Sequence, residues 1–338
     1  MRTYLREEGL SRQSRLARES RLGETQSFIL RLGLILKKFS PITHYRTTAF
    51  CLLIALLAGL WSCTKSPIPP AVQRPEVPKL LSGPHQLSFE GRRSGEGYFS
   101  RDGQHLIFQS EREPGNPFYQ IYTLDLKNGM SQRVSPGTGK STCGFFHPGG
   151  QLALFSSTYL DADASTKERE EIDLRAEGTS RRYAWDYDDQ YDIFSVALNR
   201  PNEKTPKRLT REEGYDAEAS WSPNGREIVF ASNRHAYAPG AKINSETLSR
   251  DPSIYIDLYI MDASGRNVRR LTDYEGYDGG PFFSPDGERI VWRRFSLDGA
   301  TAEIYSMKKD GTDVVQLTHL DALSWAPFYH PSGEYIIF

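Results

Sequence analysis

Carboxylates and aromatic rings crowd one part of the chain, and these residue types are well suited to metal or partner binding. Residues 161–165 read DADAS, and residues 185–192 read WDYDDQYD. Clustered carboxylates could hold Ca²⁺, but the twelve-residue loop with its Gly and closing Glu is absent. We therefore expect a solvated acidic loop without a metal or cofactor. Because aromatic rings dominate interface energetics, the candidate partner-binding residues are Trp185, Asp186, Tyr187, Asp188 and Tyr191.

Thiol chemistry has one candidate once the amino-terminal segment is set aside. As argued below, Cys51 should be removed and Cys63 should be modified, which leaves Cys143. No helix N-terminus or basic partner near Cys143 argues for the lowered pKa that a nucleophile needs. We expect it to be a small buried residue. The motifs H-E-x-x-H and G-x-S-x-G are also absent, so we expect no catalytic residue within this chain.

The charge balance argues against nucleic acid as a partner. The 338 residues carry 42 basic and 43 acidic side chains, a formal net charge of −1. No overall field would recruit a polyanion, and salt-dependent phosphate binding has no support. Aromatic residues make up 12% of the chain, which suits β-structure because rings pack well on a pleated surface.

The amino-terminal segment predicts export and lipid attachment. Residues 49–60 read AFCLLIALLAGL, an apolar stretch too short for a permanent membrane span but typical of a secretory signal. The sequence LWSC that ends at Cys63 resembles the bacterial lipobox, although Trp61 stands where a small residue is commoner. The resemblance implies cleavage before Cys63 and acyl chains on it, which would anchor the protein at a membrane. An ordinary cleaved signal or an uncleaved anchor is the alternative.

A proline-rich tether follows this signal. Residues 64–84 contain six prolines and should form an extended, semi-rigid spacer. The predicted organisation is therefore an extension with a signal peptide over 1–63, a tether over 64–84 and a folded domain over 85–338. The expected location is the cell envelope, with the domain facing the periplasm or the extracellular side.

The folded domain repeats one pattern five times. An aromatic residue, a four-residue turn and a second aromatic nine positions later begin at residues 99, 146, 221, 283 and 329. The fourth copy reads FSPDGERIVW, and all five keep Gly at the fifth place. Ser, Pro and Gly in such a turn fit a type I turn, and the alternating residues after it fit a half-buried strand.

A second hairpin follows each of the first four copies. It has an aromatic third strand, a turn that usually carries Gly, and a fourth strand that ends on a basic or amide residue, an aliphatic residue and a hydroxyl. A four-stranded unit of about 45 residues is the signature of a β-propeller blade. We expect an all-β fold with four complete blades and one partial blade.

Two of the repeats are longer than the others for the same reason. The third-strand aromatic follows the start of the copy by 23 and 22 residues in copies one and four, but by 48 and 38 in copies two and three. The additional residues therefore lie between strands two and three. In an up-and-down blade these two adjacent loops share one face, where function is more often found than on the scaffold.

These repeats look like those of the TolB-type β-propeller, which also occur in the gating propellers of prolyl-oligopeptidase-like enzymes. The resemblance covers residues 85–338 and implies a fold rather than an activity, because propellers serve binding, scaffolding and catalysis alike. TolB has an α/β domain before its propeller, whereas only the short tether stands there in this chain.

Three apparent motifs have structural explanations. The stretch GTGKST over residues 137–142 lacks the glycine spacing of a phosphate loop and falls where a connection between blades belongs. His147 and His330 replace the turn Ser in copies two and five. We expect each of them to bond to its own turn rather than to a metal.

The repeats also predict that the ring is incomplete. The segment His85–Phe89 resembles the fourth strand that ends blade four, yet it precedes blade one. The chain ends at Phe338 on the second strand of blade five, which would leave an open sheet edge. We expect a fragment or a truncated gene product of a six-bladed or larger ring.

The expected function is binding rather than catalysis. The first hypothesis is a lipid-anchored envelope propeller that holds a protein, peptide or glycan on its long-loop face. The alternative is the gating propeller of a larger exported peptidase whose catalytic domain lies beyond Phe338. A propeller lyase is a weaker third hypothesis, because no convergent His cluster is visible.

Overall fold

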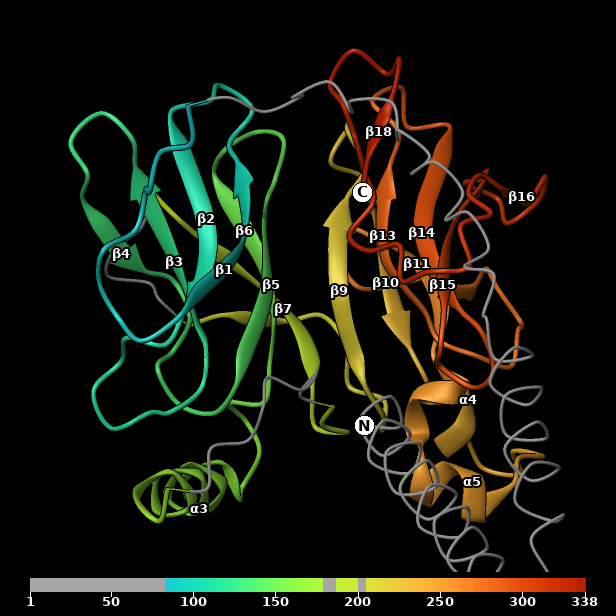
Figure 1. Ribbon diagram of the computed structural model, residues 1–338, viewed down its shortest axis with the longest axis horizontal. Helices are drawn as coiled ribbons and strands as arrows, with labels where there is room; N and C mark the ends of the chain where they lie inside the picture. The colour runs from blue at the N-terminus through green and yellow to red at the C-terminus, as the bar shows by residue number, and fades with distance from the viewer. Residues whose placement is uncertain (1–82, 179–186, 200–204) are drawn as a thin grey trace, which may run out of the picture. The chain divides into compact units, whose positions relative to one another are not determined.

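The computed structural model describes residues 83–178, 187–199 and 205–338 (Figure 1). These residues form four four-stranded antiparallel sheets and one two-stranded sheet. The strands follow one another across each sheet in chain order, so every sheet is an up-and-down meander. The sheets are the blades of a β-propeller, which confirms the expected fold class.

Each blade occupies a continuous part of the chain. Blade 1 contains β1 (Ser94–Phe99), β2 (His105–Ser110), β3 (Gln120–Asp125) and β4 (Ser131–Arg133). Blade 2 contains β5 (Ser141–Phe146), β6 (Leu152–Ser157), β7 (Asp192–Ala197) and β8 (Lys207–Arg208). Blade 3 contains β9 (Asp216–Trp221), β10 (Glu227–Ser232), β11 (Asp257–Asp262) and β12 (Arg269–Arg270). Blade 4 contains β13 (Asp278–Phe283), β14 (Arg289–Phe295), β15 (Ala302–Lys308) and β16 (Val315–Gln316), and blade 5 contains β17 (Phe328–Tyr329) and β18 (Ile336–Ile337).

Helices occur in the two loops that the repeat lengths identify. Helix α3 (Ala164–Ala176) lies between β6 and β7 of blade 2. Helices α4 (Arg234–Tyr237) and α5 (Ser245–Arg250) and the 3₁₀ helix η1 (Pro252–Tyr255) lie between β10 and β11 of blade 3. Figure 1 shows α3 beyond the ends of its two strands, and α4 and α5 in the same position in blade 3. The position of the long loops is confirmed, whereas their helices were not predicted.

The repeated turn has the geometry that its sequence predicts. In blade 4 the Ser284 hydroxyl donates to Asp286 Oδ1 and accepts from the backbone N–H of Arg289 at 2.9 Å. Gly287 donates its N–H to the Ser284 carbonyl at 2.8 Å with φ +75°, a left-handed conformation that glycine adopts without strain. Equivalent side-chain bonds join Ser100 to Asp102 and Ser222 to Asn224.

The hydroxyl that ends each fourth strand fastens it to the third strand. In blade 2 Thr210 Oγ1 accepts from the Ile193 N–H at 2.9 Å and donates to Asp192 Oδ1 at 3.1 Å. The other blades repeat the first bond, from Ile121 to Ser135, from Leu258 to Thr272 and from Ile304 to Thr318. The sequence pattern therefore marks a specific contact.

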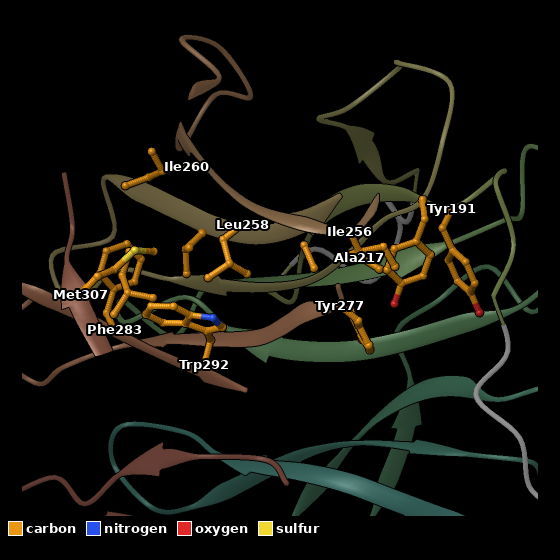
Figure 2. Packing of buried hydrophobic residues seen from close by; sticks show 13 residues of the cluster. Tyr191, Ala217, Ile256, Leu258, Ile260, Tyr277, Phe283, Trp292 and Met307 are labelled. Carbon is orange, nitrogen blue, oxygen red and sulfur yellow. The ribbon is translucent and has the colours of Figure 1, made fainter. Parts of the chain in front are cut away.

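The core lies between successive blades. In blades 2 to 4 the inner strand packs against the second and third strands of the blade before it. Figure 2 shows this packing between blades 3 and 4, where Trp292, Phe283 and Met307 lie near Leu258. Trp292 is fully buried, and its indole N–H donates to Asp278 Oδ1 at 3.0 Å. The aromatic positions of the repeat therefore hold the blades together.

Aromatic rings from the inner strands also meet across the axis. The Tyr98 ring of blade 1 lies 5.2 Å from Phe145 of blade 2, 5.3 Å from Phe282 of blade 4 and 5.9 Å from Phe328 of blade 5, measured between ring centroids. A ring that contacts three other blades requires their inner strands to converge. The arrangement is therefore radial rather than a row of stacked sheets.

Candidate functional site

The two long loops contact each other and form one ordered surface. The hydroxyls of Tyr187 in the first loop and Tyr237 in the second lie 2.9 Å apart. Asn233 donates its side-chain N–H to Tyr187 Oη at 2.8 Å. The Tyr187 ring also stacks on Tyr215 of blade 3 with centroids 5.6 Å apart. These contacts join blades 2 and 3 on one face, which we call the long-loop face.

Ion pairs fasten helix α3 to this face. Lys167 Nζ lies 2.7 Å from Asp161 Oδ2 and 3.0 Å from Asp188 Oδ2. Lys140, in the connection between blades 1 and 2, lies 3.2 Å from the same Asp188 oxygen. Partial burial raises the pKa of Asp161, but the bond to Lys167 outweighs it and leaves that pKa below its ordinary value. The helix is therefore held by charges rather than by an apolar stripe.

The candidate partner-binding residues have different surroundings. Tyr187 is partly buried, while Asp188 and Tyr191 are buried, so the last two can shape the loop but present little surface. Trp185, Asp186 and the lipid-attachment candidate Cys63 lie outside the described residues. Their roles in partner contact and anchoring stay predictions.

The expectation of a solvated acidic loop is wrong for three of the carboxylates that the structure describes, whereas Asp163 is exposed as expected. Asp161 and Asp188 pair with lysines, and the buried Asp192 pairs with Arg208 and accepts from Thr210. Burial removes water from a carboxylate, and the charged form stays stable only when cations and hydrogen-bond donors take the place of that water. Sequence proximity between acidic residues could not show that their partners come from other segments.

A second group of side chains lies on the inner strands near the same face. Each inner strand, or its equivalent in blade 5, has a residue with positive φ three places before the repeat aromatic. The pairing register between the first and second strands shifts at this residue in blades 1 to 4, so the residue forms a β-bulge. A bulge changes the direction of a side chain relative to the alternating up and down pattern of the strand. The five residues are Glu96, Cys143, Glu218, Gly280 and Ala326. Their constant spacing was a signal that the sequence analysis missed.

The Glu218 carboxylate joins blades 3 and 4 at this level. It accepts from the Tyr215 hydroxyl at 3.1 Å, from the Tyr277 hydroxyl and from the Gly280 N–H. Arg293 donates to it at 3.0 Å, and both side chains of this ion pair are buried. These donors satisfy the hydrogen-bonding capacity of the Glu218 carboxylate. Because they come from both blades, Glu218 holds the inner strands of blades 3 and 4 in position.

Cys143 lies beside Glu96 in the same group. Its Sγ is 3.7 Å from Glu96 Oε2, and burial together with the charges of Glu96 and Glu218 raises the pKa of the thiol well above its ordinary value. Glu96 is exposed at its edge of the sheet. Loss of water around its carboxylate, and then the negative charge of Glu218, nevertheless raise the pKa of Glu96 as well. A protonated thiol is a poor nucleophile, so Cys143 is the buried residue that the sequence predicts.

The three apparent motifs have the structural roles predicted for them. His147 Nδ1 accepts from the Gly149 N–H at 3.0 Å, and His330 Nδ1 accepts from the Ser332 N–H at 3.2 Å. Residues 137–140 lie in the connection between β4 and β5, and residues 141–142 begin β5. Gly139 in that connection donates its N–H to Glu168 of α3 at 2.6 Å.

Two features are absent from the described part of the chain. No group of three or more His, Cys, Asp or Glu residues within it is placed to hold a metal ion. None of its helices has the length and apolar character needed to cross a membrane.

Comparison by sequence finds partial relatives and no matching family model. The chain is 32% identical over 200 residues to the uncharacterized protein Atu1656 of Agrobacterium fabrum, which covers 58% of this chain and 53% of that protein. It is 32% identical over 110 residues to dipeptidyl-peptidase 5 of Porphyromonas gingivalis, which covers 30% of this chain and 15% of the peptidase. It is 33% identical over 82 residues to the uncharacterized peptidase YuxL of Bacillus subtilis, with 24% and 10% covered. The matches span from a tenth to about half of these relatives.

Comparison by structure finds similarity to two TolB proteins at low sequence identity. The putative TolB from Agrobacterium tumefaciens has a TM-score of 0.48 and 19% identity, with 73% of this chain and 76% of that chain covered. TolB from Acinetobacter baumannii has a TM-score of 0.47 and 20% identity, with 73% and 48% covered.

Proposed function

We propose that this chain is an exported, lipid-anchored propeller that binds a protein, peptide or glycan through its long-loop face. The described residues serve binding rather than catalysis in this proposal. The lipobox-like sequence at Cys63 supports anchoring. The tether over residues 64–84 would hold the propeller away from the membrane surface.

The observation that carries the proposal is the joining of two long loops into one ordered surface. The contact between Tyr187 and Tyr237 links the loops, and Lys167 fixes α3 beneath them. Large apolar side chains are exposed on this face at Leu160, Ile172 and Tyr274. Ordered loops that present apolar side chains lower the entropic cost of binding, because little has to be immobilised in the complex.

Site-specific photocrosslinking tests which face binds. A benzophenone side chain at Ile172 in α3 should give a discrete adduct in cells, because this position is 41% exposed on the long-loop face. Val268, in the turn between β11 and β12 on the opposite face, is 39% exposed and provides a matched control. Adducts at Val268 but not at Ile172 would place the partner on the other face and overturn the proposal.

A second candidate function is the gating propeller of an exported peptidase. The partial matches to dipeptidyl-peptidase 5 and to the peptidase YuxL favour it, because both relatives are peptidases and are much longer than the matched segments. Sequencing the gene beyond codon 338 separates the two functions. A long hydrolase-like extension would favour the peptidase, and a stop codon after one further blade would favour the binding protein.

A further inference from the structure

A cleft opens between blades 1 and 2 on the face opposite the long loops. Its volume is about 770 Å³, and it is lined by β4 and the turn between β1 and β2 in blade 1, and by the turn between β5 and β6 and the end of β7 in blade 2. Its apolar lining includes Val134, Phe146 and Val196, which also belong to the core between these blades. Ligand pockets commonly have volumes of roughly 300–1,000 Å³, so the cleft is large enough to hold a ligand.

One contact that narrows this space in the following blade pairs is missing between blades 1 and 2. Gly225, in the turn between the first two strands of blade 3, lies against His147 of blade 2. Gly287, in the same turn of blade 4, lies against Pro223 of blade 3. At the equivalent position in blade 2, a Cβ added to Gly150 would have nothing within 4 Å. These turns therefore stand apart in blades 1 and 2 where the later pairs touch.

A second contact, made by the turn between the third and fourth strands, is excluded by sequence. A Cβ added to Gly265 of blade 3 would lie 2.5 Å from the Leu209 carbonyl oxygen, and Gly311 of blade 4 lies against Leu271 in the same way. So close an approach to the preceding fourth strand is possible only for glycine. Blade 2 has no glycine in this turn, because residues 198–206 read LNRPNEKTP. Its turn therefore cannot come equally close to Val134, which corresponds to Leu209 in blade 1.

The outer edge of blade 1 forms one wall of the cleft. Four consecutive residues, Ser131–Val134, line it, and β4 is the outermost strand of its sheet (Figure 1). Val134 donates its N–H to the Ile121 carbonyl of β3 at 2.8 Å. Because backbone groups alternate in direction in an antiparallel pair, those of Ser131 and Arg133 point away from β3. An extended peptide can pair with such an edge as an additional strand.

The rim of the cleft suits a peptide that carries a carboxylate. Arg101 and His105 lie on the rim, and both are exposed. The carboxylates on the rim are held by their own turns, because Asp102 and Asp125 each accept from a backbone N–H two residues later. An arginine side chain forms strong hydrogen bonds with a carboxylate. Met130, also on the rim, is 70% exposed, and its flexible thioether can adapt to an apolar side chain.

We propose that this cleft binds an extended acidic peptide of a partner protein, which adds to blade 1 as a strand beside β4. Apolar side chains of the peptide lie on Phe146 and Val196, and its carboxylate pairs with Arg101. The edge of β4 favours a peptide over a lipid or a glycan, because only a peptide backbone has the matching N–H and C=O groups. The cleft lies on the face opposite the long loops, so this site is separate from the proposed function and does not depend on it.

A phage library of random decapeptides supplies the probe. The library is first depleted on the full chain with Arg101→Glu, which removes peptides that bind elsewhere, and is then selected on the unaltered full chain. We expect enriched peptides with an Asp or Glu and with apolar residues at alternate positions. A library that yields no such peptide would overturn the proposal.

Fluorescence polarisation of one enriched peptide, labelled with fluorescein, measures the role of charge. The peptide should bind about tenfold more weakly to Arg101→Glu, because the reversed charge repels its carboxylate. Arg226→Glu is the matched control, because Arg226 is exposed in the corresponding turn of blade 3, and it should leave the affinity unchanged. Equal weakening by both variants would mean that only the general charge of this face attracts the peptide, and would overturn the proposal.

Strand addition is tested separately from charge by Ser131→Pro. Proline removes an N–H that points away from β3, and such a position on an edge strand tolerates it. The labelled peptide should bind about tenfold more weakly to this variant, because one hydrogen bond to its backbone is lost. Ser131→Ala keeps the N–H and should bind the peptide as the unaltered chain does. Equal binding to Ser131→Pro and the unaltered chain would overturn strand addition.

Methylation of the peptide gives the same test on the unaltered protein. The amides of an added strand face β4 at every second residue. N-methylation of one alternate set of amides should therefore weaken binding about tenfold, and methylation of the other set should have little effect. If the two methylated peptides bind equally well, the peptide is not a strand of this sheet and the proposal is overturned.

Discussion

Single polar side chains decide how the strands of each blade are held. The Thr210 hydroxyl is buried and serves both the backbone N–H of Ile193 and the carboxylate of Asp192. A buried N–H group that loses its acceptor has given up its hydrogen bonds to water without a replacement, so the full free energy of desolvation destabilises the fold. The same position recurs in every complete blade, so its energetic effect can be measured at one site.

Replacing Thr210 by Val keeps the shape of the side chain and removes the hydroxyl. We expect the free energy of unfolding to fall by about 1–3 kcal/mol, because the Ile193 N–H is left without its acceptor. Urea unfolding followed by tryptophan fluorescence measures the change. Thr123→Val is the matched control, because its hydroxyl is 3.5 Å from the Gln132 carbonyl and only partly buried. Equal losses of unfolding free energy in both variants would show that the bond from the Ile193 N–H to Thr210 stabilises the fold no more than the Thr123 hydroxyl does.

His235 gives the fold a dependence on pH. Arg270 Nη2 lies 3.3 Å from His235 Nε2, and because arginine can only donate, this nitrogen must be the acceptor of a neutral ring. Burial and then the charge of Arg270 lower the pKa of His235 from 6.5 to about 4. A pKa lowered by folding stabilises the protein above pH 6.5, and the stabilisation is lost as the pH falls toward 4.

The variant His235→Gln should lose this part of the pH dependence. Burial raises the pKa of Asp216 and Asp257 to about 6, so their contribution has the opposite sign and falls as the pH rises from 3.8 to 6. Because the variant retains both aspartates, the difference in unfolding free energy between wild type and variant should shrink from pH 7 to pH 4. Urea titrations at several pH values measure it, with the exposed His105→Gln as control. A difference that stays constant over this range would contradict the assignment.

At the scale of elements, the strands were predictable and the helices were not. The turn with Ser284 and Gly287 is specified by its own residues, so its position could be read from sequence. Helix α3 has no apolar stripe, and its stability depends on charges from distant segments such as Glu111 and Asp188. Long-range ion pairs leave no local pattern, which is why only the length of this loop was predictable.

Helix α3 should loosen when its central cation is removed. Lys167→Met breaks the pairs with Asp161 and Asp188 and leaves the buried Asp188 with fewer cations. We expect faster hydrogen exchange and proteolysis within Ala164–Ala176, with little change in the global unfolding midpoint. Arg169→Met on the same helix is the control, because Arg169 is exposed. Equal protection of the helix in Lys167→Met and wild type would show that these ion pairs do not hold it.

At the scale of the whole molecule, the domain order and the anchor stay predictions from sequence. The five repeats predicted the propeller correctly because each copy carries its own turn and aromatic residues. The bulge residues Glu96, Cys143 and Glu218 were missed, because their meaning depends on strands that meet only at the axis. Local patterns therefore predicted blades, and the site between them needed coordinates.

The anchor can be tested by one substitution. Cys63→Ala should move the protein from the membrane fraction to the soluble fraction, because several acyl chains on one residue anchor stably. Cys143→Ala serves as the control and should stay with the membrane, since Cys143 is buried in blade 2. Unchanged fractionation of Cys63→Ala would rule out this residue as the anchor.

The most direct test of the radial arrangement is a nuclear Overhauser effect between the rings of Tyr98 in blade 1 and Phe282 in blade 4. Their centroids are 5.3 Å apart, nearly the same as the 5.2 Å between Tyr98 and Phe145 of the adjacent blade. We expect both cross-peaks in the folded protein. A cross-peak from Tyr98 to Phe145 without one to Phe282 would mean that the blades form an open row, and would contradict the propeller.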